Sequence, residues 1–218
     1  MQKFSALFAV KFKSNKLLIL KLKIYSIIFF GDIIMKVLGI NTSPREASNV
    51  RIALQTALGV ASAKGAETEI VDVNKLTITP CQGDNYCKEH DSECALNDDM
   101  QDIYQKIEEA DGIILASPIY FCDVNAQAKL VIDRLYSYFM NPKFAELFSE
   151  KKVSIIATHG AAPLEAFEGS LKTQMAAFEV LGFKTGDIIN LDDNNVPGAI
   201  NDKKEQLQKA KEIGENLI

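Results

Sequence analysis

Short apolar runs alternate with longer amphipathic stretches along most of the chain. Each run has the length of a strand and is rich in Val and Ile. Between the runs, apolar residues recur at helical spacing, as they do from Val50 through Leu54 and Ala57 to Val60. Apolar strands separated by helices predict an α/β domain with a parallel sheet covered on both faces. The expected strands are residues 36–41, 67–73, 112–117, 153–158 and 185–190.

The first 34 residues follow a different pattern. They carry six Lys and one acid, Asp32, among Leu, Ile and Phe residues. Their longest uncharged apolar run, residues 24–31, is far shorter than the ~18 residues that a membrane span needs. Lys residues also interrupt the place of a signal peptide's apolar core, and no small-residue cleavage site follows. We therefore expect residues 1–34 to be a basic, apolar extension outside the core, either an upstream extension of the reading frame or an amphipathic surface anchor. The folded domain is expected to span residues 35–218.

The composition is that of an average globular protein, with 218 residues of which 47% are hydrophobic and 24% charged. The formal charge is -5, and the part after the extension holds 18 basic and 28 acidic residues. No Lys- or Arg-dense patch lies outside the extension, which argues against a nucleic-acid partner. Four Cys in a large domain without a credible secretion signal suit a reducing compartment, so we expect free thiols and a cytoplasmic location.

The loop after the first expected strand carries the residue types of a phosphate site. Ligands of such sheets bind at the carboxyl ends of the strands. Here Ser43 and Arg45 precede a helix that begins near Ser48 and Asn49. The free N–H groups and partial positive charge of a helix N-terminus, with these side chains, would form a phosphate cradle; an ordinary Ser48 cap is the alternative. Neither G-x-G-x-x-G after the strand nor G-x-x-x-x-G-K-[ST] occurs, so a phosphomonoester fits better than a dinucleotide or triphosphate.

Two further loops add candidate contacts. The loop after the third run exposes Ile119, Tyr120 and Phe121, which suits a flat aromatic ligand, a dimer partner, or both. The loop after the fourth run contains His159 and Gly160, and Gly160 would allow close approach of the backbone to a ligand. A lone His after a strand can equally be a structural hydrogen-bonding residue. No nucleophile–base arrangement is visible, which argues against a hydrolase.

These segments together resemble the NAD(P)H-dependent FMN reductase superfamily, over residues 35 to about 190. The motifs that carry the resemblance are Ser43-Pro44-Arg45 with Ser48-Asn49, Ser117-Pro118-Ile119-Tyr120, and Lys129 with Asp133-Arg134. The resemblance implies a flavodoxin-like, doubly wound sheet of five parallel strands in the order 2-1-3-4-5, with FMN between strands one and three. It implies three groups of FMN contacts: Ser43, Arg45, Ser48, Asn49 and the backbone of Val50 at the phosphate, Pro118, Ile119, Tyr120 and Phe121 at the ring, and His159 and Gly160 at its pyrimidine edge.

The segment 79–97 resembles the iron-sulfur flavoproteins within that superfamily. Their pattern is C-x2-C-x2-C with a fourth Cys further on, and Asp84 stands here where the second Cys belongs. A four-iron cluster normally takes four thiolates, so a cluster would need Asp84, an exogenous ligand or Cys122 as the fourth. Zinc held by three thiolates and a further side chain such as His90 is an alternative, as is a surface loop with free thiols. The matched cysteines are Cys81, Cys87 and Cys94.

The resemblance implies an FMN-dependent oxidoreductase that takes electrons from NAD(P)H or a protein donor and passes them to a flavin, a quinone or another acceptor. The flavin carries the chemistry, so no catalytic side chain is expected. The alternatives are a non-enzymatic flavodoxin-like electron carrier and a regulatory module that has lost catalysis. The resemblance also implies a homodimer or homotetramer.

Overall fold

A computed structural model describes residues 34–160 and 162–218 of the chain. The predictions for the basic extension therefore lie outside the described residues, apart from Ile34. Residues Met35–Ile218 form one compact unit. In the described ranges, no helix is both long and apolar enough to cross a membrane.

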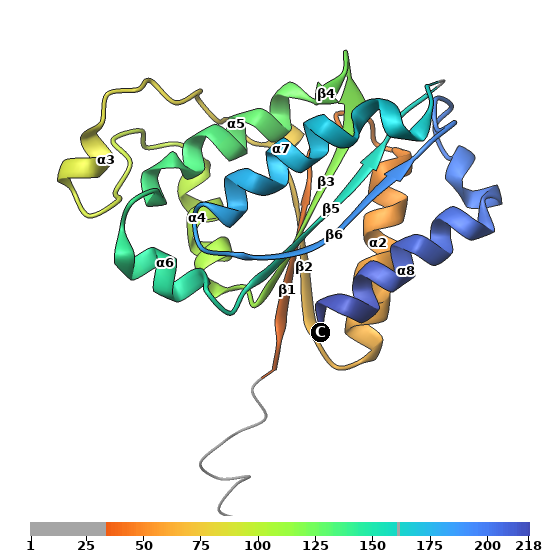
Figure 1. Cartoon of the computed structure of the whole chain (residues 1–218), viewed down its shortest axis with the longest axis horizontal. Helices are drawn as coiled ribbons and strands as arrows, with labels where there is room; N and C mark the ends of the chain where they lie inside the picture. The colour runs from red at the N-terminus through yellow and green to blue at the C-terminus, as the bar shows by residue number, and fades with distance from the viewer. Residues whose placement is uncertain (1–33, 161) are drawn as a thin grey trace, which may run out of the picture. The chain divides into compact units, whose positions relative to one another are not determined.

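Five parallel strands form the sheet, in the order β2-β1-β3-β5-β6 (Figure 1). This confirms the predicted order 2-1-3-4-5. The sheet also has a short sixth strand, β4, which was not predicted and pairs antiparallel with the end of β3. It forms because β3 continues beyond Ser117, so the segment from Pro118 to Tyr120 is strand and not loop. The strands are β1 Lys36–Asn41, β2 Glu67–Asp72, β3 Gly112–Tyr120, β4 Asp123–Val124, β5 Lys152–Thr158 and β6 Lys184–Leu191.

Helices cover both faces of the sheet, as predicted. Two helices, α2 and α8, pack against one face, and α4, α5 and α7 cover the other (Figure 1). The long helices are α2 Asn49–Ala63, α4 Met100–Glu109, α5 Ala126–Arg134, α7 Glu168–Glu179 and α8 Lys204–Leu217. The shorter ones are η1 Val73–Lys75, α3 Tyr86–Glu89, η2 Leu135–Tyr138, α6 Pro142–Phe148, η3 Leu164–Phe167 and η4 Ala199–Asp202.

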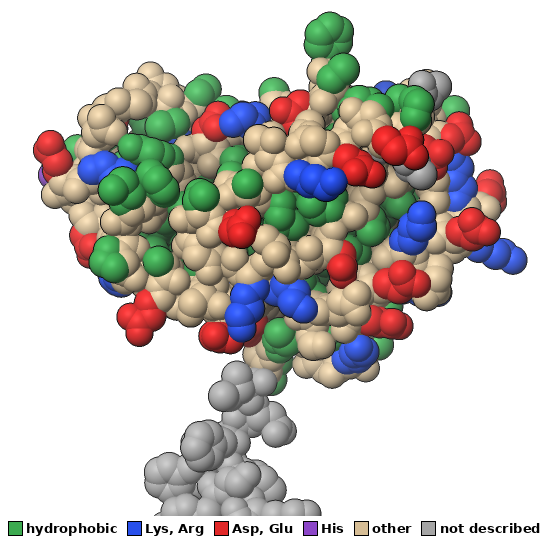
Figure 2. All heavy atoms as spheres, in the orientation of Figure 1, with side chains coloured by type: hydrophobic (Ala, Val, Ile, Leu, Met, Phe, Trp, Pro, Cys, Tyr) green, Lys and Arg blue, Asp and Glu red, His purple; other side chains and the backbone are tan. Residues whose placement is uncertain are grey.

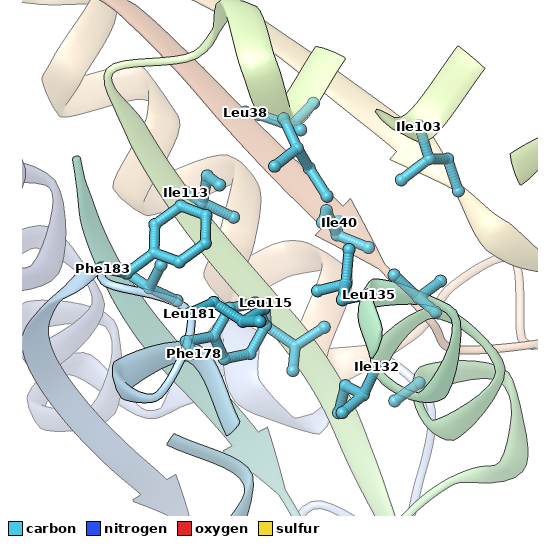
Figure 3. Packing of buried hydrophobic residues seen from close by; sticks show 14 of the residues in the cluster. Leu38, Ile40, Ile103, Ile113, Leu115, Ile132, Leu135, Phe178, Leu181 and Phe183 are labelled. Carbon is cyan, nitrogen blue, oxygen red and sulfur yellow. The ribbon is translucent and has the colours of Figure 1, made fainter. Parts of the chain in front are cut away.

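The core consists of two apolar clusters, one on each face of the sheet. Successive strand residues point to opposite faces, so Ile113 and Leu115 of β3 join one cluster and Ile114 joins the other. Figure 3 shows Ile113 and Leu115 among side chains that come from β1, α5 and α7. Burial of β3 on both faces explains its uninterrupted apolar sequence. It also holds the carboxyl end of this central strand in a fixed position.

The packing of α8 on α2 depends on Gly214. A Cβ atom at Gly214 would overlap the carbonyl oxygen of Ala57, which belongs to the α2 backbone. We expect Gly214→Ala to lower the free energy of unfolding by about 1–3 kcal/mol through overpacking. Gly59, in α2, has open space where a Cβ would lie, so Gly59→Ala should raise it by up to about 1 kcal/mol. Urea denaturation of both variants tests this, and equal effects would contradict it.

Candidate functional site

A cavity of about 230 Å³ lies at the carboxyl edge of the sheet. It is bordered by the loop after β1, the end of β3 and the loops after β5 and β6. The lining contains all but one of the predicted flavin contacts: Ser43, Arg45, Ser48, Asn49, Val50, Pro118, Ile119, Tyr120, His159 and Gly160. Three further residues complete the lining: Thr158, Asn194 and Asn195. The structure thus brings together the end of β3, the start of α2 and the loops after β1, β5 and β6.

A second cavity of about 250 Å³ lies at the opposite edge of the sheet, beside the start of β1. Four of its charged side chains form ion pairs, Lys36 with Glu109 at 3.1 Å and Lys106 with Glu69 at 2.6 Å. We place the candidate site at the carboxyl edge because ligands of doubly wound sheets bind there, and because that cavity has polar groups without partners, described below.

Phe121 is the predicted contact that does not line the cavity. It stands at the tip of the β3–β4 hairpin, where its side chain is fully exposed, at 104%. Phe121 and Cys122 have φ angles of 48° and 78°, the left-handed conformation required at both central residues of a tight hairpin turn. Figure 2 shows apolar atoms projecting from the molecule where this hairpin lies in Figure 1. The turn therefore places the Phe121 side chain outside the cavity that Tyr120 lines, and a contact of Phe121 with the ring stays a prediction.

The N-terminus of α2 forms one end of the cavity. The Ser48 hydroxyl accepts the N–H of Arg51 at 3.2 Å, so Ser48 caps the helix, and its O–H can still donate. The backbone N–H groups of Asn49 and Val50 lie in the first turn of α2, where the helix has no carbonyl oxygen to accept them. Free N–H groups, the helix dipole and the nearby Arg45 guanidinium together favour an anion. The cap and the phosphate cradle are therefore compatible roles of Ser48.

The side chain of Asn49 has a role other than the predicted contact with phosphate. Its Nδ2 donates to the carbonyl oxygens of Asn194 and Val196, both at 2.8 Å, and its Oδ1 accepts the N–H of Ile200 at 3.1 Å. Both amide hydrogens are thus used within the protein. Asn49 holds the segment after β6 against α2, and it offers a ligand only its backbone N–H.

Asn125, the cap of α5, connects the loop after β1 with the end of β3. Its Nδ2 donates to the carbonyl oxygen of Thr42 at 2.6 Å, and its Oδ1 accepts the N–H of Ala128 at 3.1 Å. The backbone N–H of Asn125 donates to the Ser117 hydroxyl at 3.2 Å. Sequence reasoning did not single out this role. Asn125 is recognisable from the sequence as a residue that can cap a helix. Its bond to Thr42, 83 residues away in the chain, is not, because no local pattern contains it.

His159 forms another part of the cavity wall. Its side chain is buried, and among the described residues neither ring nitrogen has a hydrogen-bond partner. The Phe167 ring packs edge-on against it at 4.9 Å between centroids. Burial lowers the pKa of His159, although Asp192 and the backbone of Gly160 partly oppose this. Unpartnered buried polar groups are costly and rare in folded proteins. The imidazole is therefore a neutral group that lines the cavity and is suited to hydrogen-bond a ligand.

The free energy of unfolding of the ligand-free protein is expected to decrease as the pH is lowered below about 6.5, the ordinary pKa of histidine. The pKa of His159 is lowered in the folded state. The unfolded chain therefore binds a proton first as the pH falls, which shifts the equilibrium toward unfolding. Urea denaturation at about pH 7.5 and about pH 5.5 measures the effect. The difference should be smaller in His159→Phe than in the wild type, and equal differences would contradict this role.

A buried ion pair closes the neck of the cysteine loop, which we define as residues 80–95. Arg134 Nη1 donates to Asp98 Oδ2 at 2.8 Å and to the carbonyl oxygen of Thr79 at 2.9 Å. Asp98 Oδ2 also accepts the N–H of Thr79 at 2.8 Å, and Asp98 Oδ1 accepts the N–H of Met100 at 3.1 Å. Asp98 thus accepts an N–H at the start of α4, while Asp99 Oδ2 accepts the N–H of Thr77 at 2.7 Å. The ion pair also fixes the two ends of the loop to each other.

The three matched cysteines lie on this loop as free thiols, with Cys81 exposed and Cys87 and Cys94 half-buried. Burial raises the pKa of Cys87; Lys88 opposes the rise, and the nearby Cys94 and Cys81 thiols add to it. Within residues 34–160 and 162–218, no three Cys, His, Asp or Glu side chains form a group that could hold a single metal ion.

The sequence model of one family, described as NADPH-dependent FMN reductase, matches residues 35–186. The match covers most of the chain and includes nearly all of the cavity lining. The chain belongs to this family. An iron-sulfur flavoprotein of Archaeoglobus fulgidus is 31% identical over 185 residues, which are 84% of this chain and 79% of that protein.

A second relative of this member of the FMN reductase family has a higher sequence identity over a shorter range. An iron-sulfur flavoprotein of Methanocaldococcus jannaschii is 44% identical over 100 residues, 46% of this chain. The match spans about half the length of this relative and of a second, similar one. Among solved structures, NAD(P)H:quinone oxidoreductase from Methanothermobacter marburgensis has the same fold, with a TM-score of 0.64 and 21% identity. The alignment covers 84% of this chain and 96% of that one.

Proposed function

We propose that this chain is an FMN-dependent oxidoreductase that takes electrons from NAD(P)H or a protein donor. The observation that carries the proposal is the cavity at the ends of β1, β3 and β5. It combines an anion site at the α2 N-terminus with a buried, unpartnered His159. A phosphorylated ligand with a polar aromatic ring matches that combination, and the family to which the chain belongs takes its name from FMN.

The phosphate of FMN would bind at the α2 end of the cavity. The donors there are the backbone N–H groups of Asn49 and Val50, the hydroxyls of Ser43 and Ser48, and the guanidinium of Arg45. Arg45 already donates to the carbonyl oxygen of Asn195 at 3.0 Å, which holds the guanidinium at the cavity. Val50 has no polar side-chain atom, so it offers the phosphate only its backbone N–H.

The ring of FMN would lie along the end of β3. Pro118, Ile119 and Tyr120 offer an apolar surface, and the neutral His159 imidazole would hydrogen-bond the polar edge of the ring. Gly160 has no side chain to obstruct the ring. When bound, FMN supplies the electron transfer itself, so these residues act by binding, orienting and excluding water.

The partners of the reaction are also part of the proposal. The donor would be NAD(P)H or a reduced protein, and the acceptor a flavin, a quinone or another small molecule or protein. Tyr120 is 41% exposed, so the proposed ring site stays open to such partners on that side. We further propose a homodimer or homotetramer and a cytoplasmic location.

The cysteine loop would hold an iron-sulfur cluster. The loop supplies three of the four thiolates that a four-iron cluster normally takes, and the Arg134–Asp98 pair closes its neck. Relatives named iron-sulfur flavoproteins support the assignment. An electron carrier with the same two cofactors is the second candidate, and the cysteine loop is the observation that favours it.

Purified protein mixed with FMN should bind it and oxidise NADH or NADPH steadily when an acceptor is added. Arg45→Ala should weaken FMN binding about tenfold or more through the loss of a charged hydrogen bond. Lys75→Ala is the matched control, because Lys75 is a cation at the same edge that does not line the cavity. Absence of FMN binding would overturn the proposal. FMN binding without nicotinamide oxidation would favour the carrier.

A further inference from the structure

A further cavity of about 380 Å³, which we call the β2 cavity, lies at the carboxyl edge of the sheet beside the end of β2. It shares Ser43 and Arg45 with the flavin cavity, so the two cavities meet at the loop after β1. Its volume is in the range of small-ligand sites. The proposed function assigns no ligand to this space. The charged residues of its lining are Arg45, Glu46, Arg51, Asp72 and Lys75.

Asp72, the last residue of β2, positions two of the cations. Its Oδ2 lies 3.1 Å from Lys75 Nζ, and its Oδ1 accepts hydrogen bonds from Arg51 Nη1 and, at 2.8 Å, from Asn41 Nδ2. Burial by itself would raise the pKa of Asp72, but hydrogen bonds from Asn41 and Lys75 and the charge of Arg51 outweigh it, so the pKa is lowered. One ionised carboxylate therefore holds two cations at the wall of the β2 cavity.

The β2 cavity has an excess of positive charge. Three cations line it, against the two carboxylates of Glu46 and Asp72. The domain around it is acidic, because the chain after the basic extension holds 18 basic and 28 acidic residues. A local excess of cations in an acidic domain favours an anionic ligand at that place.

The position of Arg51 in its helix also indicates an anion. Arg51 stands in the first turn of α2, and this turn contains no acidic residue. The N-terminus of a helix carries a partial positive charge, so a cation there is unfavourable for the helix. Asp72 offsets part of this charge, and an anion bound in the β2 cavity would offset more of it. Residues that break a local rule in this way are expected at functional sites.

Hydrogen bonds fix the β2 cavity to the flavin cavity. The buried Asn41 donates to Asp72, and its Oδ1 accepts the N–H of Ser43 at 3.4 Å. The Ser43 hydroxyl accepts the N–H of Arg45 at 3.3 Å, and the Arg45 guanidinium donates to the carbonyl oxygen of Asn195 at 3.0 Å. The loop after β1 is thus tied to Asp72 on one side and to the wall of the flavin cavity on the other.

A ribose that carries a 2′-phosphate matches the charges of the β2 cavity. Its phosphomonoester would lie between the Arg51 guanidinium and the Lys75 ammonium, which are the groups that bind phosphates most strongly. Asp72 Oδ2 would accept the neighbouring hydroxyl of the ribose. In dinucleotide-binding sheets of the doubly wound class, an acidic residue takes the free ribose hydroxyls of NAD, and a nearby Arg accommodates the 2′-phosphate of NADP. The β2 cavity contains both kinds of group.

We propose that the β2 cavity binds the 2′-phosphorylated ribose of NADPH, so that the chain prefers NADPH to NADH as its electron donor. This inference rests on the proposed function, in which a nicotinamide nucleotide reaches the flavin at the end of β3. The two nucleosides of NADPH are joined by a diphosphate and therefore occupy separate places on the protein. The β2 and flavin cavities adjoin at one edge of the sheet, which gives each half of the dinucleotide a place.

The test uses adenosine 2′,5′-bisphosphate as the probe, titrated into the full chain with and without bound FMN. The probe should bind without displacing FMN and about fivefold or more tightly than AMP, which lacks the 2′-phosphate. Lys75→Ala should weaken its binding about three- to fivefold, because an exposed cation is lost. Arg51 still pairs with Asp72 in this variant, so the fold is kept. Glu46→Gln should strengthen binding, because it removes a negative charge from the lining.

Lys172→Ala is the matched control. Lys172 forms an exposed ion pair with Glu168 at 3.0 Å and lines neither cavity, so this variant should bind the probe as the wild type does. Steady-state oxidation of the two donors gives a second measurement. Lys75→Ala should raise the KM for NADPH about three- to fivefold and leave the KM for NADH unchanged.

Three outcomes would overturn the inference while leaving the proposed flavin function intact. One is a chain that binds FMN but not the probe, and another is displacement of FMN by the probe, which would place the probe in the flavin cavity. The third is equal affinity of the wild type and Lys75→Ala for the probe. Conversely, a chain that binds the probe but not FMN would support the β2 cavity as a site for a phosphorylated ribose and would overturn the proposed function.

Discussion

Replacing Arg134 with Met is expected to lower the free energy of unfolding by about 3–5 kcal/mol. The Arg134 side chain is fully buried, and Asp98, its partner at 2.8 Å, is 9% exposed. Without the guanidinium, the carboxylate of Asp98 would stay buried with its charge unpaired, and the carbonyl oxygen of Thr79 would lose its donor. Such an uncompensated charge costs far more than a surface ion pair contributes.

The pH dependence of this pair has a definite sign. Burial by itself would raise the pKa of Asp98, but hydrogen bonds from Arg134 and from the N–H groups of Thr79 and Met100 outweigh it, so the pKa is lowered. The ion pair therefore contributes its full stability at pH values above about 3.9, the pKa of Asp98 in the unfolded chain. This stability is lost as the pH falls through the lowered pKa of the folded state.

Urea denaturation at neutral pH measures the effect of Arg134→Met. Lys172→Met is the control, because Lys172 forms an exposed helical pair with Glu168 that should be worth about 0.5 kcal/mol or less. A double variant, Arg134→Met with Asp98→Leu, should be less destabilised than the sum of its two single variants. A cost of Arg134→Met no larger than that of the control would show that the pair does not hold the neck of the loop.

Asn49→Ala is expected to lower the free energy of unfolding by about 2–4 kcal/mol and to weaken FMN binding as well. The substitution leaves the carbonyl oxygen of Asn194 and the N–H of Ile200 without their partner, and the carbonyl oxygen of Val196 keeps only the N–H of Ala199. Each orphaned buried group costs roughly 1 kcal/mol or more. The freed segment carries Asn194 and Asn195, which line the cavity, so the binding site loses part of its wall.

Two measurements separate these effects. Urea denaturation without FMN reports the loss of stability, and FMN titration under conditions where the variant is fully folded reports the loss of the cavity wall. Ser48→Ala is the matched control in the same turn and should cost only about 1 kcal/mol as a lost helix cap. If Asn49→Ala is no less stable than Ser48→Ala, the side chain of Asn49 does not fasten the segment after β6.

The location of the candidate site was predictable because parallel strands bring the loops that follow them to one edge. Ser43 with Arg45, Tyr120, and His159 with Gly160 follow or end three neighbouring strands, and the cavity joins them. The prediction did not include Asn194 and Asn195, which follow the last strand and also line the cavity. Their place in the wall depends on Asn49, some 145 residues earlier in the chain.

The sequence by itself determined the alternation of strands and helices, since periods of two and 3.6 residues are local properties of the chain. It also determined which loops carry polar and glycine residues at strand ends, and which loop carries the three cysteines. Only the tertiary structure decided that β3 runs on into a hairpin that turns Phe121 away, that Asn49 serves the protein rather than the ligand, and that Arg134 closes the cysteine loop. These outcomes depend on hydrogen bonds and burial between residues far apart in the chain, which no local pattern contains.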